Sequence, residues 1–454
     1  MDAAIKLTGS SQRLRLQLWG TAALICSFAA GMAAFWSPSV AHAFFYSLFG
    51  VAAVLVLLIY PEVALALYVV IGDLKGDDRI AALLPVDLTL ALGALLLVGI
   101  ALNLLRHKRV VRMPASYFLF IALVAIMTAS LTYTPVFDAG LEKLGRFLTV
   151  TGIVIVAPFF LLGTRQQTVR FFASFAVAAF AICAWSLFAL GGSERLVTPS
   201  NNTIGLGHIA CALILILWFA ALPFFSFPRR FFVYPLLSVP VLALIGSGSR
   251  GPAIACALVI LGSAVMCRSR ILDLVCALAL GSAILPFARV PGSAIQYLGT
   301  LVSGRSVSGL LSFRYDLLEY GWRLLQQHPL VGTGIQGFRY YSPNPELYKW
   351  PHNIFLEIAC ELGIPAALIA CTIFAAAIAE AIRQLRDTIS PAFLLSQLAA
   401  ALLVVGAVNA TNTGDINSDR LTWLFLSLVF VMRGVRTRES DSRELLVETL
   451  PAPA

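Results

Sequence analysis

Long hydrophobic runs separated by short polar connectors make up most of the chain. Apolar segments occur at 17–36, 43–59, 62–72, 84–102, 114–131, 147–163, 169–190, 204–225, 231–247, 252–267, 271–288, 353–378, 392–410 and 420–433. A helix needs roughly 20 residues to cross the hydrocarbon core of a bilayer, with about 17 as the lower limit. The segments 62–72 and 420–433 are short by this measure. The pattern predicts an all-α, polytopic membrane protein with about 12 to 14 transmembrane helices.

Two features near the N-terminus affect this count. Pro61-Glu62 interrupts the apolar stretch 43–72, which is either two short helices or a re-entrant hairpin. The run 17–36 follows basic residues and precedes Ala41-His42-Ala43, as in a signal peptide. It is longer than the roughly 7–15 residues of a signal-peptide core, so we expect an uncleaved first helix.

The longest polar stretch, 289–351, divides the chain into parts. We expect N-terminal membrane helices at 1–288, a long loop at 289–351, C-terminal membrane helices at 352–433 and a tail at 434–454. Within the loop, 313–327 has apolar residues at helical spacing and is followed by His328-Pro329. An amphipathic helix here would lie on the membrane face or cap the bundle. The charged tail from about Thr437 is expected to be disordered.

Composition and charge support a membrane location. Hydrophobic residues make up 59% of the chain and charged residues 12%, whereas a soluble domain has about 25% charged residues. The net charge of +9 comes largely from connectors such as 106–112, so it indicates orientation rather than nucleic-acid binding. The positive-inside rule predicts cytoplasmic termini and an outer location for 289–351. The eight cysteines form no CxxC or zinc spacing, and we expect neither a disulfide framework nor a metal site.

Candidate chemistry begins at Pro351-His352-Asn353, where the long loop meets the segment 353–378. A histidine at a helix N-terminus is held neutral, as a general base requires. Alternatively, Asn353 simply caps the helix. Glu357 and Glu361 follow one turn apart. They either pair with loop arginines or stay at the water interface, because burying two carboxylates in a membrane helix is costly.

Arginines on the same outer side are candidate anion ligands. Arg250 lies in the short turn Ser247–Pro252, where a guanidinium either grips a phosphate or snorkels to the interface. Arg314 and Arg339 in the long loop are further candidates, since the basic excess there suits an anionic ligand. His208 begins a helix on this side and either contacts a sugar or is a satisfied polar residue.

The letters Gly332-Thr333-Gly334-Ile335-Gln336-Gly337 match GxGxxG. A dinucleotide site is excluded because no strand precedes the motif and no βαβ unit surrounds it. The glycines either offer backbone N–H groups to a phosphate or form a sharp turn.

Together these residues resemble the O-antigen ligase and polymerase superfamily of lipid-linked glycan transferases. The matching stretches are Ser249-Arg250-Gly251, Arg314, the run from Trp322 through His328-Pro329 to Phe338, Pro351-His352-Asn353 and Gly363. His352, Asn353 and Gly363 fit the ligase pattern of His-Asn, nine residues, then Gly-x-x-(Gly/Thr/Tyr), whereas Ala366 departs from it. The resemblance covers about 247–366 and favours the ligase.

From this resemblance we expect a metal-independent, inverting glycosyltransferase without cofactors at the periplasmic face of the bacterial inner membrane. The donor would be a glycan on undecaprenyl diphosphate, and the acceptor lipid A–core. His352 would be the base, Arg250, Arg314 and Arg339 would bind diphosphate, and Asn353, Glu357 and His208 would support them. A polymerase using the same donor stays open. A transporter of the lipid-linked glycan is less favoured, because confident spans lack central ionisable residues and the halves show no repeat.

Overall fold

The computed structural model describes residues 50–74, 87–107, 113–188, 195–284, 292, 310–346, 348–388, 392–412 and 414–448. Two compact units divide the chain, Met1–Tyr60 and Pro61–Ala454. In the first, residues 50–59 form a helix. The predicted first helix, 17–36, lies outside the described residues.

In its described part the second unit contains helices joined by turns and loops and no strands, which confirms the all-α part of the predicted fold class. Its first half contains α3 (Pro61–Leu74), α5 (Leu88–His107), α6 (Tyr117–Ser130), α7 (Phe137–Arg146), η1 (Phe147–Thr151), α8 (Gly152–Leu161), α9 (Arg165–Phe188), α10 (Thr203–Ile216), η2 (Leu217–Ala221), η3 (Leu222–Phe224), α11 (Phe227–Arg230), α12 (Val233–Ser247), α13 (Arg250–Met266) and α14 (Arg268–Ile284). Its second half contains α16 (Leu310–Gln327), α17 (Gly337–Tyr341), α18 (Ile354–Leu362), α19 (Ile364–Arg386), α20 (Phe393–Ala410) and α21 (Arg420–Glu448).

Among the described residues, six helices are long and apolar enough to span a membrane. They are Leu88–Leu105, Phe137–Leu161, Arg165–Phe188, Thr203–Phe224, Ile364–Arg386 and Phe393–Ala410. The interrupted pair 50–59 and Pro61–Leu74 raises the number to seven if it is one span, and three shorter apolar helices accompany them. The chain is therefore a multi-pass membrane protein, and the number of about 12 spans stays a prediction.

Three predicted boundaries are wrong. The segment predicted at 147–163 belongs to a helix that begins at Phe137, because α7 continues through the π-turn η1 into α8. The segment predicted as one helix at 353–378 is broken at Gly363, whose φ of +87° lies outside the helical region. The tail predicted to be disordered from Thr437 is helical to Glu448, since its Arg, Glu and Leu residues favour helix.

Buried aromatic residues form the centre of the second unit. Trp423 of α21 is fully buried and makes edge contacts with Phe120, Phe147 and Phe374 from three other helices. The Tyr117 hydroxyl donates to Ser427 Oγ at 2.8 Å. This hydrogen bond satisfies two buried hydroxyl groups within the protein, as a low-dielectric surrounding requires.

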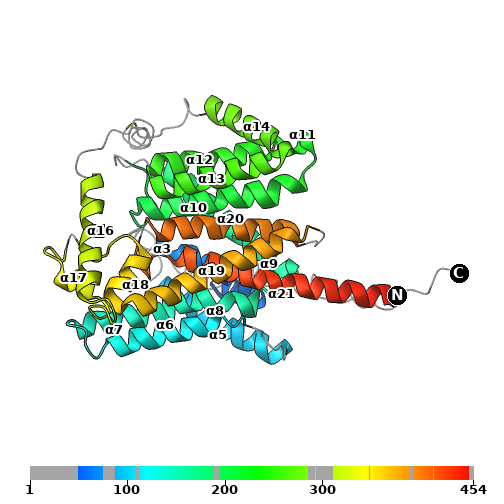
Figure 1. Ribbon diagram of the computed structural model, residues 1–454. Coiled ribbons are helices and arrows are strands. Elements are labelled where there is room, and N and C mark those ends of the chain that lie inside the picture. Colours follow the sequence, from blue (N-terminus) through cyan, green and yellow to red (C-terminus); the bar gives the residue numbers. More distant parts are fainter. Residues whose placement is uncertain are drawn as a thin grey trace, which may run out of the picture. The chain divides into compact units, whose positions relative to one another are not determined.

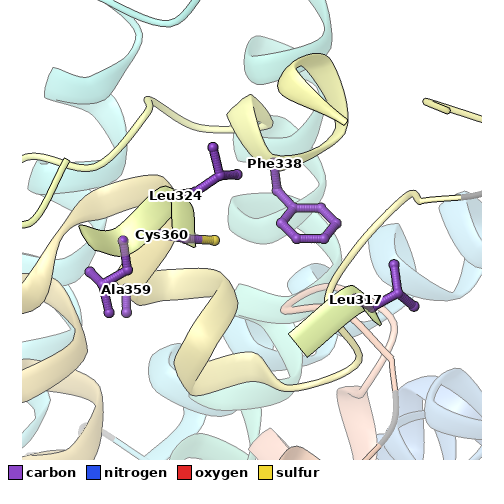
Figure 2. Packing of buried hydrophobic residues seen from close by; sticks show 6 residues of the cluster. Leu317, Leu324, Phe338, Ala359 and Cys360 are labelled. Carbon is purple, nitrogen blue, oxygen red and sulfur yellow. The ribbon is translucent and has the colours of Figure 1, made fainter. Parts of the chain in front are cut away.

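The amphipathic helix predicted at 313–327 is confirmed as α16. It packs its apolar side on α17 and α18, where Leu317, Leu324, Phe338, Ala359 and Cys360 form one buried cluster (Figure 2). Within Pro61–Ala454, Figure 1 shows α16, α17 and α18 together at one end of the helices.

Basic connectors meet at the opposite end. Arg436 bonds Asp387 and Gln384, and the guanidinium of Arg438 donates to Gly163 O. The connectors after α8 and α19 thus lie beside the last helix, away from α16–α18 (Figure 1). The charge pattern predicts that these two connectors and the last helix share one side, which the contacts support, while the side of the membrane stays a prediction.

Candidate active site

The segment before α18 holds His352 in an unusual backbone conformation. Asn353 is the N-cap, and its side chain accepts a hydrogen bond from the N–H of Leu356 at 3.1 Å. The predicted cap is therefore formed by Asn353, which leaves the imidazole of its neighbour out of the capping role. His352 has φ +56°, a strained value for a residue with a side chain that is often found at functional sites.

The surroundings of His352 favour a neutral imidazole. Burial, followed by the positive charge of Arg314, lowers the pKa of His352 to about 4, and Asp415 opposes this shift. The ring meets Trp350 edge-on at 5.9 Å. The buried Nδ1 atom has no hydrogen-bond partner within the described part of the chain. A neutral ring can accept a proton, which is what a general base does.

The candidate arginines occupy different places. Arg314 lies on α16 and acts electrostatically on His352, so tertiary structure brings these two predicted residues together. Arg339 of α17 instead pairs with Glu346 at 2.9 Å and donates to Pro345 O. This local pairing occupies part of its guanidinium.

Arg250 is the first residue of α13. The Ser249 hydroxyl before it donates to Thr203 O at 2.9 Å, which joins this turn to the start of α10. His208 on α10 is buried, with Nδ1 3.9 Å from Asp419 Oδ1. Asp419 ends the loop 414–419, and the same loop carries Asp415, which acts on His352. These contacts place the starts of α10 and α13 next to the loop beside His352.

The glycine-rich turn is committed to protein contacts. The N–H groups of Thr333 and Gly334 donate to the carbonyls of Cys360 and Glu361 at the end of α18, at 2.9 and 2.8 Å. The Gln336 N–H donates to Glu361 Oε2 at 3.0 Å. Because these donors are used, this turn caps a helix and the suggestion of a phosphate cradle is wrong for these three groups.

Glu357 and Glu361 do not pair with loop arginines, in contrast to one sequence-based expectation. Both carboxylates contact the Lys143 ammonium at 2.6 Å, and all three side chains are at most 8% exposed. Glu357 Oε2 also accepts the N–H of Ile416 at 3.0 Å. Burying charges requires such pairing, because an unpaired buried charge costs on the order of several kcal/mol.

Sequence reasoning missed three residues beside the predicted site: Lys143, Asp415 and Trp350. Lys143 lies in a helix whose start was not recognised. The signal that could have found it is the pair Glu357 and Glu361 in an apolar segment, because two buried carboxylates need a cation. Asp415 follows Gly414 in a short turn before the last helix, a location that carries no chemical signature by itself. No group of three His, Cys, Asp or Glu side chains suited to a metal ion occurs in the residues that the structure describes.

The fold and this site define a multi-pass helical membrane protein with a histidine–arginine–aspartate cluster at one end. Residues 235–371 match the family model described as O-antigen ligase. This match covers α12 through the start of α19 and confirms the resemblance to the O-antigen ligase superfamily, a family of membrane enzymes of the ligase and polymerase type. No curated protein matches the chain.

Proposed function

We propose that this protein is a glycosyltransferase of the O-antigen ligase type. It transfers a glycan from undecaprenyl diphosphate to lipid A–core at the periplasmic face of the inner membrane. The observation that carries the proposal is the setting of His352, whose buried Nδ1 has no hydrogen-bond partner among the described residues and which the Arg314 charge reaches, within the segment that matches the ligase family.

In the proposed reaction His352 takes the proton of the acceptor hydroxyl. The oxygen attacks the anomeric carbon of the donor sugar while the bond from that carbon to the diphosphate breaks, so configuration inverts. Negative charge grows on the departing diphosphate, and Arg314 and Arg250 stabilise it there. Asp415 stabilises the imidazolium that forms.

Purified protein in detergent tests this proposal with lipid-linked glycan, lipid A–core and EDTA. Wild type is expected to transfer the glycan, and His352→Ala to lose at least roughly 100-fold, since general bases contribute about 10²–10⁴-fold. His328→Ala is the matched control, because His328 lies in the same loop, is exposed and stacks on Tyr341. A folded His352→Ala protein with full activity would exclude the histidine as base.

The polymerase remains the alternative, because Ala366 departs from the ligase pattern at the last position. In that case wild type leaves lipid A–core unmodified and lengthens the lipid-linked glycan instead. Gel analysis of both lipids in one reaction separates the two activities. Movement of intact lipid-linked glycan across sealed vesicles, with no product bond formed, would favour a transporter.

A further inference from the structure

A buried charge network joins the helix behind His352 to the loop that carries Asp415. We propose that Glu357, held by Lys143, is a positioning residue that sets Asp415 against His352 for proton transfer. This inference rests on the proposed function and adds residues to it.

The network is built from three ionisable side chains. Lys143 Nζ lies 2.6 Å from Glu357 Oε1 and 2.6 Å from Glu361 Oε2. The Lys143 side chain is only 8% exposed, so its ammonium is largely removed from solvent and depends on these two carboxylates. Lys143 therefore fixes the rotamers of both carboxylates, and through them the orientation of their second contacts.

Those second contacts reach other parts of the chain. Glu361 Oε2 accepts from Gln336 N in the glycine turn, and Glu357 Oε2 accepts from Ile416 N in the loop 414–419, both at 3.0 Å. Asn417 Nδ2 donates to Lys143 O at 3.0 Å, so the loop is also tied to α7. The hydrogen bond that Glu357 accepts thus holds the loop 414–419 to α18.

The loop bond lies next to the reacting groups. Ile416 directly follows Asp415, whose carboxylate acts on His352, and Glu357 lies in the helix that begins just after His352. A change at Glu357 consequently alters the spacing of Asp415 and His352 without removing either. Small misplacements of catalytic groups, about 1 Å, can cost roughly 100-fold in rate.

Two substitutions of equal length separate this role from simple packing. Glu357→Gln retains an acceptor oxygen for Ile416 N, whereas Glu357→Met removes it, and both remove the charge. We expect Glu357→Met to lower kcat roughly 10- to 100-fold and Glu357→Gln to lower it by about threefold or less. The donor KM should stay within about twofold in both, because neither touches the arginines proposed to bind diphosphate.

Lys143→Met should reduce kcat as well, since it releases both carboxylates. Its control is Arg146→Met on the same helix, because Arg146 pairs with Glu142 at 2.6 Å but both are exposed. That control should keep wild-type kcat. Thermal unfolding of each protein in detergent, with activity expressed per folded enzyme, removes losses caused by unfolding.

A double-mutant cycle with Asp415→Asn gives the decisive readout. If Glu357 acts through Asp415, Glu357→Met and Glu357→Gln should differ by less than about twofold in the Asp415→Asn protein, because residues that act as a unit are not additive. Equal kcat for the two variants in the wild-type background, or full additivity in the cycle, would overturn the inference. Should Glu357→Met not fold, Lys143→Met takes its place in the cycle, and its effect on kcat should fall below about twofold in the Asp415→Asn protein. If His352→Ala loses activity but the effects at Glu357 are additive, the inference is rejected and the proposed function is kept. If His352→Ala retains full activity, the proposed function itself is rejected.

Discussion

At the scale of single residues, burial and two opposite charges set the pKa of His352. Burial and Arg314 both disfavour the imidazolium, and Asp415 favours it. Before reaction the ring is therefore neutral and able to accept a proton. Once the proton has been transferred, Asp415 is the group that offsets the cost of the new charge.

This balance predicts the pH dependence of the reaction. With the pKa of His352 near 4, wild-type kcat/KM should stay level down to about pH 5 and fall at lower pH, because protonated imidazole cannot act as a base. Removing a positive neighbour favours protonation, so Arg314→Gln should move the acid limb to higher pH. Asp415→Asn should move it to lower pH.

Transfer assays at a series of pH values measure these limbs. Arg323→Gln provides the control on the same helix, because Arg323 is 65% exposed and pairs with Glu319. Its limb should coincide with that of wild type. An acid limb of wild type near the ordinary histidine pKa, about 6.5, would contradict the lowered pKa of His352. So would an acid limb that does not move in Arg314→Gln.

At the scale of elements, the end of α18 depends on glycines. Gly363 has φ +87°, and a Cβ there would meet Leu330 O at 2.1 Å. The Ile364 N–H donates to Pro329 O at 2.9 Å, and this hydrogen bond joins the turn after α16 to the break between α18 and α19. The break thus lets one helix end against the loop and the next begin as a membrane span.

Gly363→Ala is therefore expected to destabilise the protein by about 1–3 kcal/mol or more, from backbone strain and the overlap with Leu330 O. Gly262→Ala is the control within α13, since a Cβ there meets nothing within 4 Å. Alanine in that helix should stabilise by about 0.5–1 kcal/mol. Thermal unfolding in detergent measures both, and equal stability of the two variants would show that Gly363 is dispensable.

At the scale of the whole molecule, the described contacts separate a basic end from the end that holds the candidate site. Lys143, His352 and Asp415 belong to the second, whereas Arg436 and Arg438 belong to the first. From the positive-inside rule we expect the basic end to be cytoplasmic. The candidate site would then face the periplasm, where the proposed donor and acceptor meet.

Labelling with a membrane-impermeant maleimide tests this orientation in a cysteine-free protein. Lys349→Cys, at an exposed position of the long loop, should react in cells with an intact inner membrane. Arg386→Cys, exposed at the end of α19, should react only after that membrane is opened. The reverse pattern would invert the topology and place the site in the cytoplasm.

The sequence alone determined the class of protein and most elements, because membrane helices are specified by local hydropathy. It also located the helix cap at Asn353 and the amphipathic helix α16, and it gave His352 as the candidate base, which stays a prediction. Helix continuity was harder to predict. Polar residues hid α7, whereas Gly363 followed by Pro365 was a signal for the break within 353–378 that the prediction of one helix did not use.

Tertiary structure alone decided which charges meet. Lys143 and Glu357 are 214 positions apart by their numbers, and Asp415 is a further 58 along the chain, so no local pattern could pair them. Burial is the reason they do: carboxylates removed from water need a cation, and the available one comes from another helix. The same principle assigned the glycine turn to the carbonyls of α18, whose helix end required donors.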